Sequence, residues 1–168
     1  MMKLHLLRHG IAASRGSSRA CSDAERPLTP EGRDKLVRAA RALGAMELEF
    51  DLVLSSPAVR ARETAELVVK TLGTGRRIEV SEHLAPDRDW RRFVRDLAAR
   101  RPGLENPLLV GHEPYLSNLA SFLLTGGPGL DLVLKKGGYC RLGIGRLRAG
   151  RCAALELLLA PRLMALMG

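Results

Sequence analysis

Apolar segments of strand length alternate along the chain with segments that carry apolar side chains at helical spacing. Apolar runs at residues 2–7, 51–55 and 107–111 predict buried strands, and a shorter run at 77–81 predicts another. Residues 10–28 are polar and contain Gly, Ser and Pro, so we expect a loop there.

Helix-start signals lie between the predicted strands. Thr29 is placed to cap a helix whose first residue is Pro30 and which runs to about residue 44. Ser56 precedes a proline in the same way, and predicts a helix that runs to about Leu72. The other expected elements are a helix at 87–99 capped by Asp87 or Asp89, a helix at 114–124, strands at 139–147 and 151–159, and a short C-terminal helix.

This alternation predicts an α/β fold, with a mainly parallel sheet, helices on both of its faces and a late antiparallel strand pair. The length suits one domain spanning residues 1–168. In such folds ligands bind at the carboxyl ends of the strands. Those ends carry Arg8-His9-Gly10, Ser55-Ser56 and Gly111-His112-Glu113, so two histidines and an arginine are expected together at one edge of the sheet.

The chain is strongly basic, with a net charge of +9 and a pI near 10.3. Such a balance favours acidic partners, namely phosphorylated ligands, acidic proteins or nucleic acid. The arginines are scattered, however, and a compositional bias that only aids solubility explains them equally well. Nucleic-acid binding rests on charge alone, without a recognisable motif, and is the least favoured of these.

Several features predict a cytoplasmic protein without a membrane span. No apolar run reaches the roughly 20 residues that a span needs, and His5 and Arg8 interrupt the apolar N-terminal stretch. The three cysteines, Cys21, Cys140 and Cys152, are odd in number and form no C-x-x-C pair, which fits free thiols in a reducing compartment. No Cys, His or carboxylate cluster has metal-ligand spacing, so we expect no metal and no cofactor.

Arg8, His9 and Gly10 form the first candidate chemical motif. A neutral His9 has a lone pair on one ring nitrogen and can attack phosphorus. The planar fork of Arg8 matches phosphate oxygens. Gly10 lets the backbone turn sharply and approach a ligand. Three residues alone recur often by chance, so the motif needs support from other parts of the chain.

Two further residues extend this motif. Arg60 lies in the first turns of the helix predicted after Ser56, whose N-terminus favours an anion. His112 follows an apolar strand at the same predicted edge as His9. The competing interpretations are that Arg60 is a solvated surface residue and that His112 is a packed residue without a role in chemistry. We interpret Arg62, two positions further along the helix, as a surface residue.

Together the motifs resemble those of the histidine phosphatase superfamily, also called the phosphoglycerate mutase-like or RHG family. Four matching motifs occur in the family's order over residues 4–116, which makes the resemblance specific. They are Leu7-Arg8-His9-Gly10, Arg26-Pro27-Leu28-Thr29-Pro30-Glu31-Gly32, Ser55-Ser56-Pro57-x-x-Arg60-Ala61-x-x-Thr64 and Val110-Gly111-His112-Glu113-Pro114.

Within the superfamily, the chain most resembles the SixA-type phosphohistidine phosphatases. It shares their compact length and their R-P-L-T segment. It has no large insertion between Thr64 and Gly111, where larger members carry a lid over the site. That interval has room for little beyond a strand and a helix. We therefore expect a single histidine phosphatase domain without a lid.

The resemblance implies a role for each candidate residue. His9 would be the nucleophile, and Arg8, Arg60 and His112 would bind the phosphoryl oxygens and supply the positive charge that a metal supplies elsewhere. Arg26 would reach the rim of the pocket, although a surface ion pair explains it equally well.

The general acid is left open between Glu82, His83 and no residue at all. Relatives that act on phosphoesters carry a glutamate after the third strand, and Glu82 stands there, so we include it among the residues at the substrate. A plain surface position is the competing interpretation of Glu82. A phosphohistidine substrate needs an acid less, because an imidazole that can be protonated leaves easily.

These inferences predict a metal-independent phosphatase that hydrolyses phosphohistidine on a protein, such as a phosphorelay domain, through a phospho-His9 intermediate. A phosphatase for small phosphoesters is the first alternative, with the same site and another leaving group. A non-catalytic module that binds phosphorylated proteins is an alternative from another class.

Overall fold

Six strands form one mixed sheet in the order β3-β2-β4-β1-β5-β6. The structure is a computed structural model and describes residues 1–14, 16, 22–100 and 103–167. Its strands are β1 (Met2–Arg8), β2 (Leu52–Ser55), β3 (Ile78–Val80), β4 (Pro107–Gly111), β5 (Tyr139–Ile144) and β6 (Ala153–Leu159).

Four neighbouring strands are parallel, as the alternation of strands and helices predicts. β1 pairs in parallel with β4, β4 with β2, and β2 with β3. β5 is antiparallel to both of its neighbours, β1 and β6, which confirms the late antiparallel pair. Both late strands are shorter than the pattern predicts, because the turn between them begins at Gly145 and contains Gly150 at a φ of 100°.

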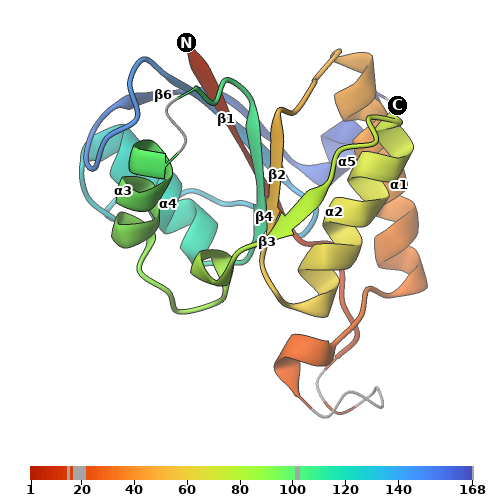
Figure 1. The fold of residues 1–168 in the computed structure, drawn as a ribbon. Helices are drawn as coiled ribbons and strands as arrows, with labels where there is room; N and C mark the ends of the chain where they lie inside the picture. Colours follow the sequence, from red (N-terminus) through yellow and green to blue (C-terminus); the bar gives the residue numbers. More distant parts are fainter. Residues whose placement is uncertain (15, 17–21, 101–102, 168) are drawn as a thin grey trace.

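Helices cover both faces of the sheet (Figure 1), and this confirms the predicted fold class. One face carries α1 (Pro30–Ala45), α2 (Val59–Leu72) and the short α5 (Pro161–Met164). The other carries α3 (Trp90–Arg100) and α4 (Tyr115–Thr125). Two clusters of buried apolar side chains, one on each face, pack between the helices and the sheet. Burying both faces explains why β4 is apolar along its whole length.

The helix-start predictions hold for two helices and fail for a third. The Thr29 hydroxyl accepts a hydrogen bond from the amide of Gly32 at 3.0 Å and caps α1. The Asp89 carboxylate accepts one from the amide of Arg91 at 2.9 Å at the start of α3. The predicted start of α2 was wrong, because α2 begins three residues after Ser56 without a side-chain cap, while its end at Leu72 is as predicted.

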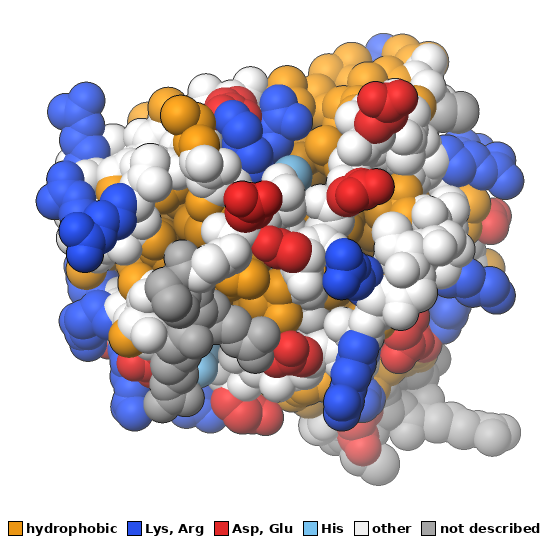
Figure 2. All heavy atoms as spheres, turned by 45° about the horizontal axis from the view of Figure 1, so that its top comes forward, with side chains coloured by type: hydrophobic (Ala, Val, Ile, Leu, Met, Phe, Trp, Pro, Cys, Tyr) orange, Lys and Arg blue, Asp and Glu red, His pale blue; other side chains and the backbone are white. Residues whose placement is uncertain are grey.

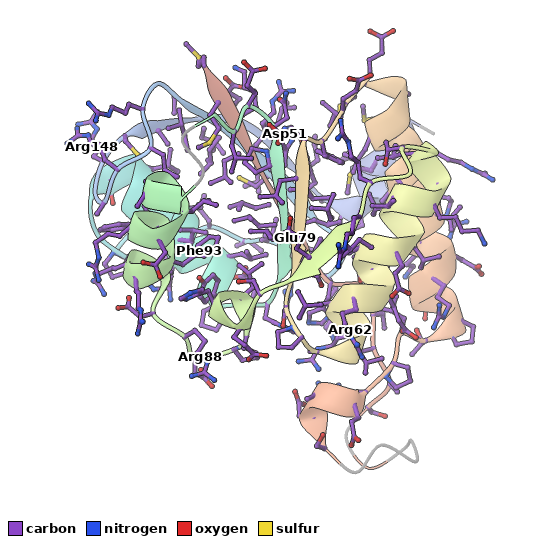
Figure 3. All side chains as sticks on the ribbon, viewed as in Figure 1. Asp51, Arg62, Glu79, Arg88, Phe93 and Arg148 are labelled. Atoms are coloured by element: carbon purple, nitrogen blue, oxygen red, sulfur yellow. The ribbon has the colours of Figure 1, made fainter. Side chains whose placement is uncertain are left out.

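Short elements fill the segment between α2 and β4. From Ile78 to Arg100 the chain forms β3, the 3₁₀ turn η2 (Glu82–Leu84) and α3. Figure 3 shows that Phe93 belongs to α3 and that Arg88 lies in the turn that precedes it. The single domain without a lid stays a prediction, which these elements fit.

Asp51 joins segments at the end of the sheet opposite the candidate site (Figure 3). Its carboxylate accepts hydrogen bonds from the amides of Glu105 and Asn106, at 2.6 and 3.0 Å. Figure 2 turns this end forward, and charged side chains of both signs are interspersed there with apolar ones. In the described ranges, no helix is both long and apolar enough to cross a membrane.

Candidate active site

The register of β1 against β4 brings the two candidate histidines together. Arg8 lies opposite Gly111, so His9 and His112, the next residues of each strand, are neighbours. The amide of His9 donates to the carbonyl of Gly111 at 3.0 Å, and the two imidazole rings lie 4.9 Å apart between centroids. Both side chains are buried. The predicted meeting of the two strand ends is therefore observed.

The hydrogen bonds of His9 determine which ring nitrogen carries the lone pair. Its Nδ1 lies 2.7 Å from the carbonyl oxygen of Gly10. A carbonyl only accepts, so Nδ1 carries the proton and donates. The lone pair is then on Nε2, which accepts from Nε of Arg60 at 3.3 Å. His9 thus presents a nucleophilic nitrogen to a cationic side chain.

Arg60 joins the two histidines from the first turn of α2. Besides donating to His9, its Nη2 lies 3.3 Å from Nδ1 of His112. The side chain of Arg60 is only 4 % exposed, whereas Arg62 lies on the exposed side of the same helix (Figure 3). The structure therefore separates these two arginines as the sequence interpretation does.

Ser56 orients His112, a role that the sequence interpretation missed. Because Arg60 donates to Nδ1 of His112, the neutral ring carries its proton on Nε2. That nitrogen donates to the Ser56 hydroxyl at 2.7 Å. Ser56 was interpreted as a helix cap; its hydroxyl accepts from the amide of Ala58 at 3.3 Å just before α2 and also contacts His112. The position of Ser56 at the end of β2 was the signal that could have revealed this.

Arg8 lies at the edge of the site, and only part of its guanidinium forms hydrogen bonds with the described part of the chain. Its Nη1 donates to the carbonyl of Leu134 at 2.8 Å. Its Nε is buried and has no hydrogen-bond partner among the described residues. A buried N–H without a partner is costly, which favours a ligand that accepts from it.

Burial keeps both histidines neutral. Burial is the largest cause of a His9 pKa of about 3; the Gly10 hydrogen bond opposes it, and the charges of His112, Arg60 and Arg8 add to it. Burial and the Arg60 charge likewise lower the pKa of His112 to about 4. Without a ligand the positive charge therefore resides on Arg8 and Arg60, whereas the resemblance implied a contribution from His112 as well.

Asp23 is the most important residue that the sequence interpretation missed. It begins the 3₁₀ turn η1 (Asp23–Glu25), which lies beyond the amino end of α2 (Figure 1). Arg60 donates from Nη2 to the Asp23 carboxylate at 3.0 Å and from Nη1 to its carbonyl at 2.6 Å. A carboxylate thus contacts the arginine that is expected to bind phosphate.

Arg26 reaches the edge of the site through the same aspartate. Its Nε donates to the Asp23 carboxylate at 2.9 Å, and its Nη1 donates to the carbonyl of Ala13 at 2.7 Å. Both interpretations of Arg26 therefore hold in part, because it forms an ion pair and that ion pair adjoins Arg60. The spacing of Asp23 three residues before Arg26 was the available signal.

Packing requires glycine at position 10, whereas the predicted sharp turn does not. Its φ is not among the positive values of the chain, so a sharp turn does not demand glycine there. A Cβ at this position would instead lie 2.5 Å from Cδ1 of Leu36 on α1. The Gly10 amide also donates to the Thr64 hydroxyl at 3.1 Å, which ties the loop after β1 to α2. Close packing explains the glycine.

Glu82 and His83 lie in η2, after the third strand. The Glu82 side chain is exposed, in keeping with a surface position. His83 Nε2 lies 3.4 Å from a carboxylate oxygen of Asp96, and its ring lies 6.0 Å from that of Phe93. Both partners belong to α3, so His83 is turned toward that helix.

Glu113, which follows His112, is a half-buried carboxyl beside the site. Its Oε1 accepts from the amide of Ser117 at 3.2 Å at the start of α4. Burial raises the pKa of Glu113, while the hydrogen bond and the charge of Arg8 oppose this. Across the described part of the chain, no three or more His, Cys, Asp or Glu side chains are grouped so as to hold a metal ion.

Comparison with known proteins identifies the family. A model described as the histidine phosphatase superfamily (branch 1) matches residues 4–90, just over half of the chain. The chain belongs to the histidine phosphatase superfamily. Its activity is therefore that of a phosphatase.

Two curated relatives match this chain over most of their own length. The phosphohistidine phosphatase SixA of Escherichia coli is 33% identical over 126 residues, which are 74% of this chain and 76% of SixA. An uncharacterized protein of Picosynechococcus sp. is 35% identical over 164 residues, which are 96% of this chain and 98% of that protein.

Two solved structures share the fold of this chain. The protein histidine phosphatase SixA complexed with tungstate has a TM-score of 0.82 and 26% identity, covering 97% of this chain and 99% of that chain. A mycobacterial glucosyl-3-phosphoglycerate phosphatase has a TM-score of 0.69 at 20% identity, covering 93% and 97%. The second likeness concerns the fold alone.

Proposed function

We propose that this phosphatase hydrolyses phosphohistidine on a protein, without a metal ion and through a phosphohistidine intermediate at His9. The observation that carries the proposal is the Nε2 lone pair of His9, which faces Arg60 and lies beside His112. The 33% sequence identity with the phosphohistidine phosphatase SixA supports phosphohistidine as the substrate class.

The first chemical step transfers the phosphoryl group to His9. Nε2 of His9 attacks phosphorus in line with the scissile bond, and a new N–P bond forms as the substrate's N–P bond breaks. The electron pair of the broken bond returns to the substrate imidazole, which takes a proton from solvent and leaves. His9 needs no base, because its pKa of about 3 keeps Nε2 unprotonated at neutral pH.

The second step regenerates the enzyme. Water attacks the phosphorus of phospho-His9, and the N–P electron pair returns to Nε2. The water oxygen keeps one proton as a hydroxyl of the released phosphate, and its second proton passes to another oxygen of that phosphate. The Gly10 carbonyl holds the Nδ1 proton during both steps, so the ring keeps the orientation that aims Nε2 at phosphorus.

Three side chains would stabilise the charge of the phosphoryl group. Arg8 offers the N–H that has no partner, and Arg60 offers N–H groups that now contact Asp23 and His112. A bound dianion favours the protonated form of His112, so this ring becomes a donor as the ligand binds. Preorganised donors of this kind typically contribute about 10²–10³ each in rate.

The leaving group decides whether an acid is needed. The imidazole of phosphohistidine leaves readily once it is protonated, whereas the alkoxide of a phosphoester needs a proton from the enzyme. Glu82 is exposed and His83 pairs with Asp96, and neither arrangement marks a dedicated acid. We therefore propose that neither residue is essential for phosphohistidine.

A protein substrate and a cytoplasmic location are part of the proposal. The short elements between α2 and β4 support access by a large substrate, because a lid would need a longer insertion there. The net charge of +9 favours acidic protein partners. Cys140 and Cys152 are free thiols, which fits a reducing compartment, while Cys21 lies outside the described residues.

Comparing two substrates tests the proposal. We expect kcat/KM for a phosphohistidine protein to exceed that for p-nitrophenyl phosphate and to fall more steeply with salt, because screening weakens long-range attraction. A chelator should leave both rates unchanged. Equal values with equal salt dependence would instead support the small-phosphoester alternative, and a rate restored by Mg²⁺ after chelation would contradict the metal-independent mechanism.

A further inference from the structure

A groove of about 1010 Å³ begins at the carboxyl end of β1 and runs between α1 and α5. Its apolar lining comes from the loop after β1 and from the C-terminal segment: Ile11, Ala160, Pro161, Ala165 and Leu166. The Leu166 side chain is 80% exposed, and Leu163 and Met167 beside it are 50% and 47% exposed. The groove and its edge therefore offer apolar surface that a partner could cover.

The rim of this groove is basic. Its exposed cations are Lys35, Arg38, Lys135, Lys136 and Arg162, and within the described residues no Asp or Glu lines it. Lys35 is paired at 2.5 Å with Glu31 on the outer surface of α1. An excess of positive charge remains, in contrast with the mixed charges of the face in Figure 2. The rim suits a negatively charged partner.

The groove is continuous with the candidate active site. Arg8 lines the groove and donates to the carbonyl of Leu134, just before Lys135. The amide of Gly137, just after Lys136, donates to the carbonyl of His9 at 3.0 Å. The backbone that carries both lysines is thus bound directly to the residues expected to bind and attack phosphorus.

We propose that this groove docks an acidic surface with an apolar centre, located next to the phosphohistidine on the substrate protein. The proposal rests on the proposed function and names the part of the enzyme that would recognise the protein. A small phosphoester would not span the groove, so recognition there would raise kcat/KM for proteins alone.

Two synthetic phosphohistidine peptides test the docking. In the first, glutamates and leucines flank the phosphohistidine, and in the second, lysines replace the glutamates. We expect the wild-type enzyme to hydrolyse the acidic peptide with at least a tenfold higher kcat/KM. The triple variant Lys135→Glu/Lys136→Glu/Arg162→Glu should lose or reverse this preference, because its rim has opposite charge.

A matched control reverses the same number of charges at the other end of the sheet. Arg146, Arg148 and Arg151 are exposed in the turn between β5 and β6. The register places this turn beside Met2, at the amino end of β1, and Figure 3 shows Arg148 far from α5. Arg146→Glu/Arg148→Glu/Arg151→Glu should keep the preference for the acidic peptide.

The apolar part of the proposal has its own variants. Leu166→Ser removes the most exposed apolar side chain of the groove, while Leu155→Ser removes an exposed leucine on β6. We expect the first change to weaken binding of the acidic peptide about threefold or more and the second to leave it unchanged. Equal effects of the two changes would contradict an apolar contact in the groove.

Binding to the His9→Ala variant separates the docking proposal from the proposed function. Fluorescence anisotropy of the labelled peptides gives dissociation constants that do not depend on turnover. If neither peptide is hydrolysed but the acidic one binds through the groove, the proposed substrate is wrong and the docking surface stands. If both peptides bind alike, or the rim variant keeps the acidic preference, the docking proposal is overturned.

Discussion

Arg60 makes more contacts in the site than a phosphate-binding residue needs, because it touches both histidines and Asp23. Its charge lowers the pKa of His9 and His112, and its planar fork reaches both rings. One side chain therefore sets the protonation state of the nucleophile and supplies donors for the phosphoryl group.

Substitutions at Arg60 should separate these two roles. Arg60→Ala should lower kcat/KM by about 10²–10³ and raise the pKa of both histidines, because a donor and a positive charge are lost. Arg60→Lys should keep the histidine pKa values low yet lose most of the rate, because the lysine ammonium lacks the planar, paired N–H donors of a guanidinium. Kinetics and NMR titration of the histidines measure both effects, and unchanged pKa values in Arg60→Ala would contradict this account.

Asp23 should compete with anions for Arg60. Asp23→Asn keeps the size of the side chain and removes its charge, so we expect vanadate and inorganic phosphate to inhibit about tenfold more strongly. Glu25→Gln is the matched control, because Glu25 lies in the same turn and accepts from the Ser22 hydroxyl instead. Equal changes in the two inhibition constants would show a general charge effect rather than competition at Arg60.

Sequence reasoning found the residues at strand ends but missed their connecting partners. His9 and His112 were predictable because each follows an apolar strand, and parallel strands end at one edge. Asp23 and Ser56 each left a weak signal, a three-residue spacing to Arg26 and a place at a strand end, but their partners depend on how a loop folds over α2 and on which donor a hydroxyl meets. Local patterns contain neither fact.

The elements position the site through close packing between the loop after β1 and α1. Gly32 lies in the first turn of α1, where a Cβ would be 2.2 Å from the carbonyl oxygen of Ile11. The same oxygen accepts from the amide of Thr29 at 2.9 Å, so the loop cannot move away without losing that bond. Helix propensity alone would favour alanine here.

Gly32→Ala should therefore destabilise the protein by about 1–3 kcal/mol, the usual cost of overpacking, although alanine is the better helix former. Gly44→Ala in the same helix is the control, since its Cβ would meet only the movable Leu72 side chain, at 3.2 Å. We expect that change to stay within about 1 kcal/mol of wild type. Urea unfolding measures both values, and equal stabilities would contradict the packing argument.

At the level of secondary structure, the sequence predicted most helices and strands and misplaced the start of one helix. Hydrophobic runs located β4, because a strand buried on both faces is apolar throughout. The start of α2 was wrong because Ser56 can hydrogen-bond locally without beginning a helix, and its contact with His112 depends on the tertiary fold. The groove was not predictable at all, since it needs α1 packed beside the distant α5.

The whole molecule should lose stability as the pH falls below neutral. Folding lowers the pKa of His5, His9 and His112 to between about 3 and 4, mainly through burial. Below their unfolded value of about 6.5 the unfolded chain binds protons that the folded protein excludes. The free energy of unfolding is then largest above pH 6.5 and falls between pH 6.5 and 4.

His5 gives this prediction a test away from the site. It lies in the core, with Nδ1 2.6 Å from the Tyr139 hydroxyl. His5→Gln should lower stability at neutral pH and reduce its pH slope by up to one proton, about 1.4 kcal/mol per pH unit. Urea unfolding between pH 7 and 5 measures the slope. An unchanged slope in the variant would show that His5 takes up protons in the folded state.

The central claim is that His9 carries the phosphoryl group, and trapping the intermediate tests it most directly. Labelled substrate is mixed with the enzyme, the reaction is quenched in alkali, where phosphohistidine survives, and the labelled peptide is identified by mass spectrometry. We predict label on His9 and none in the His9→Ala variant, which should also be inactive. Label on another residue, or full turnover by His9→Ala, would contradict the account.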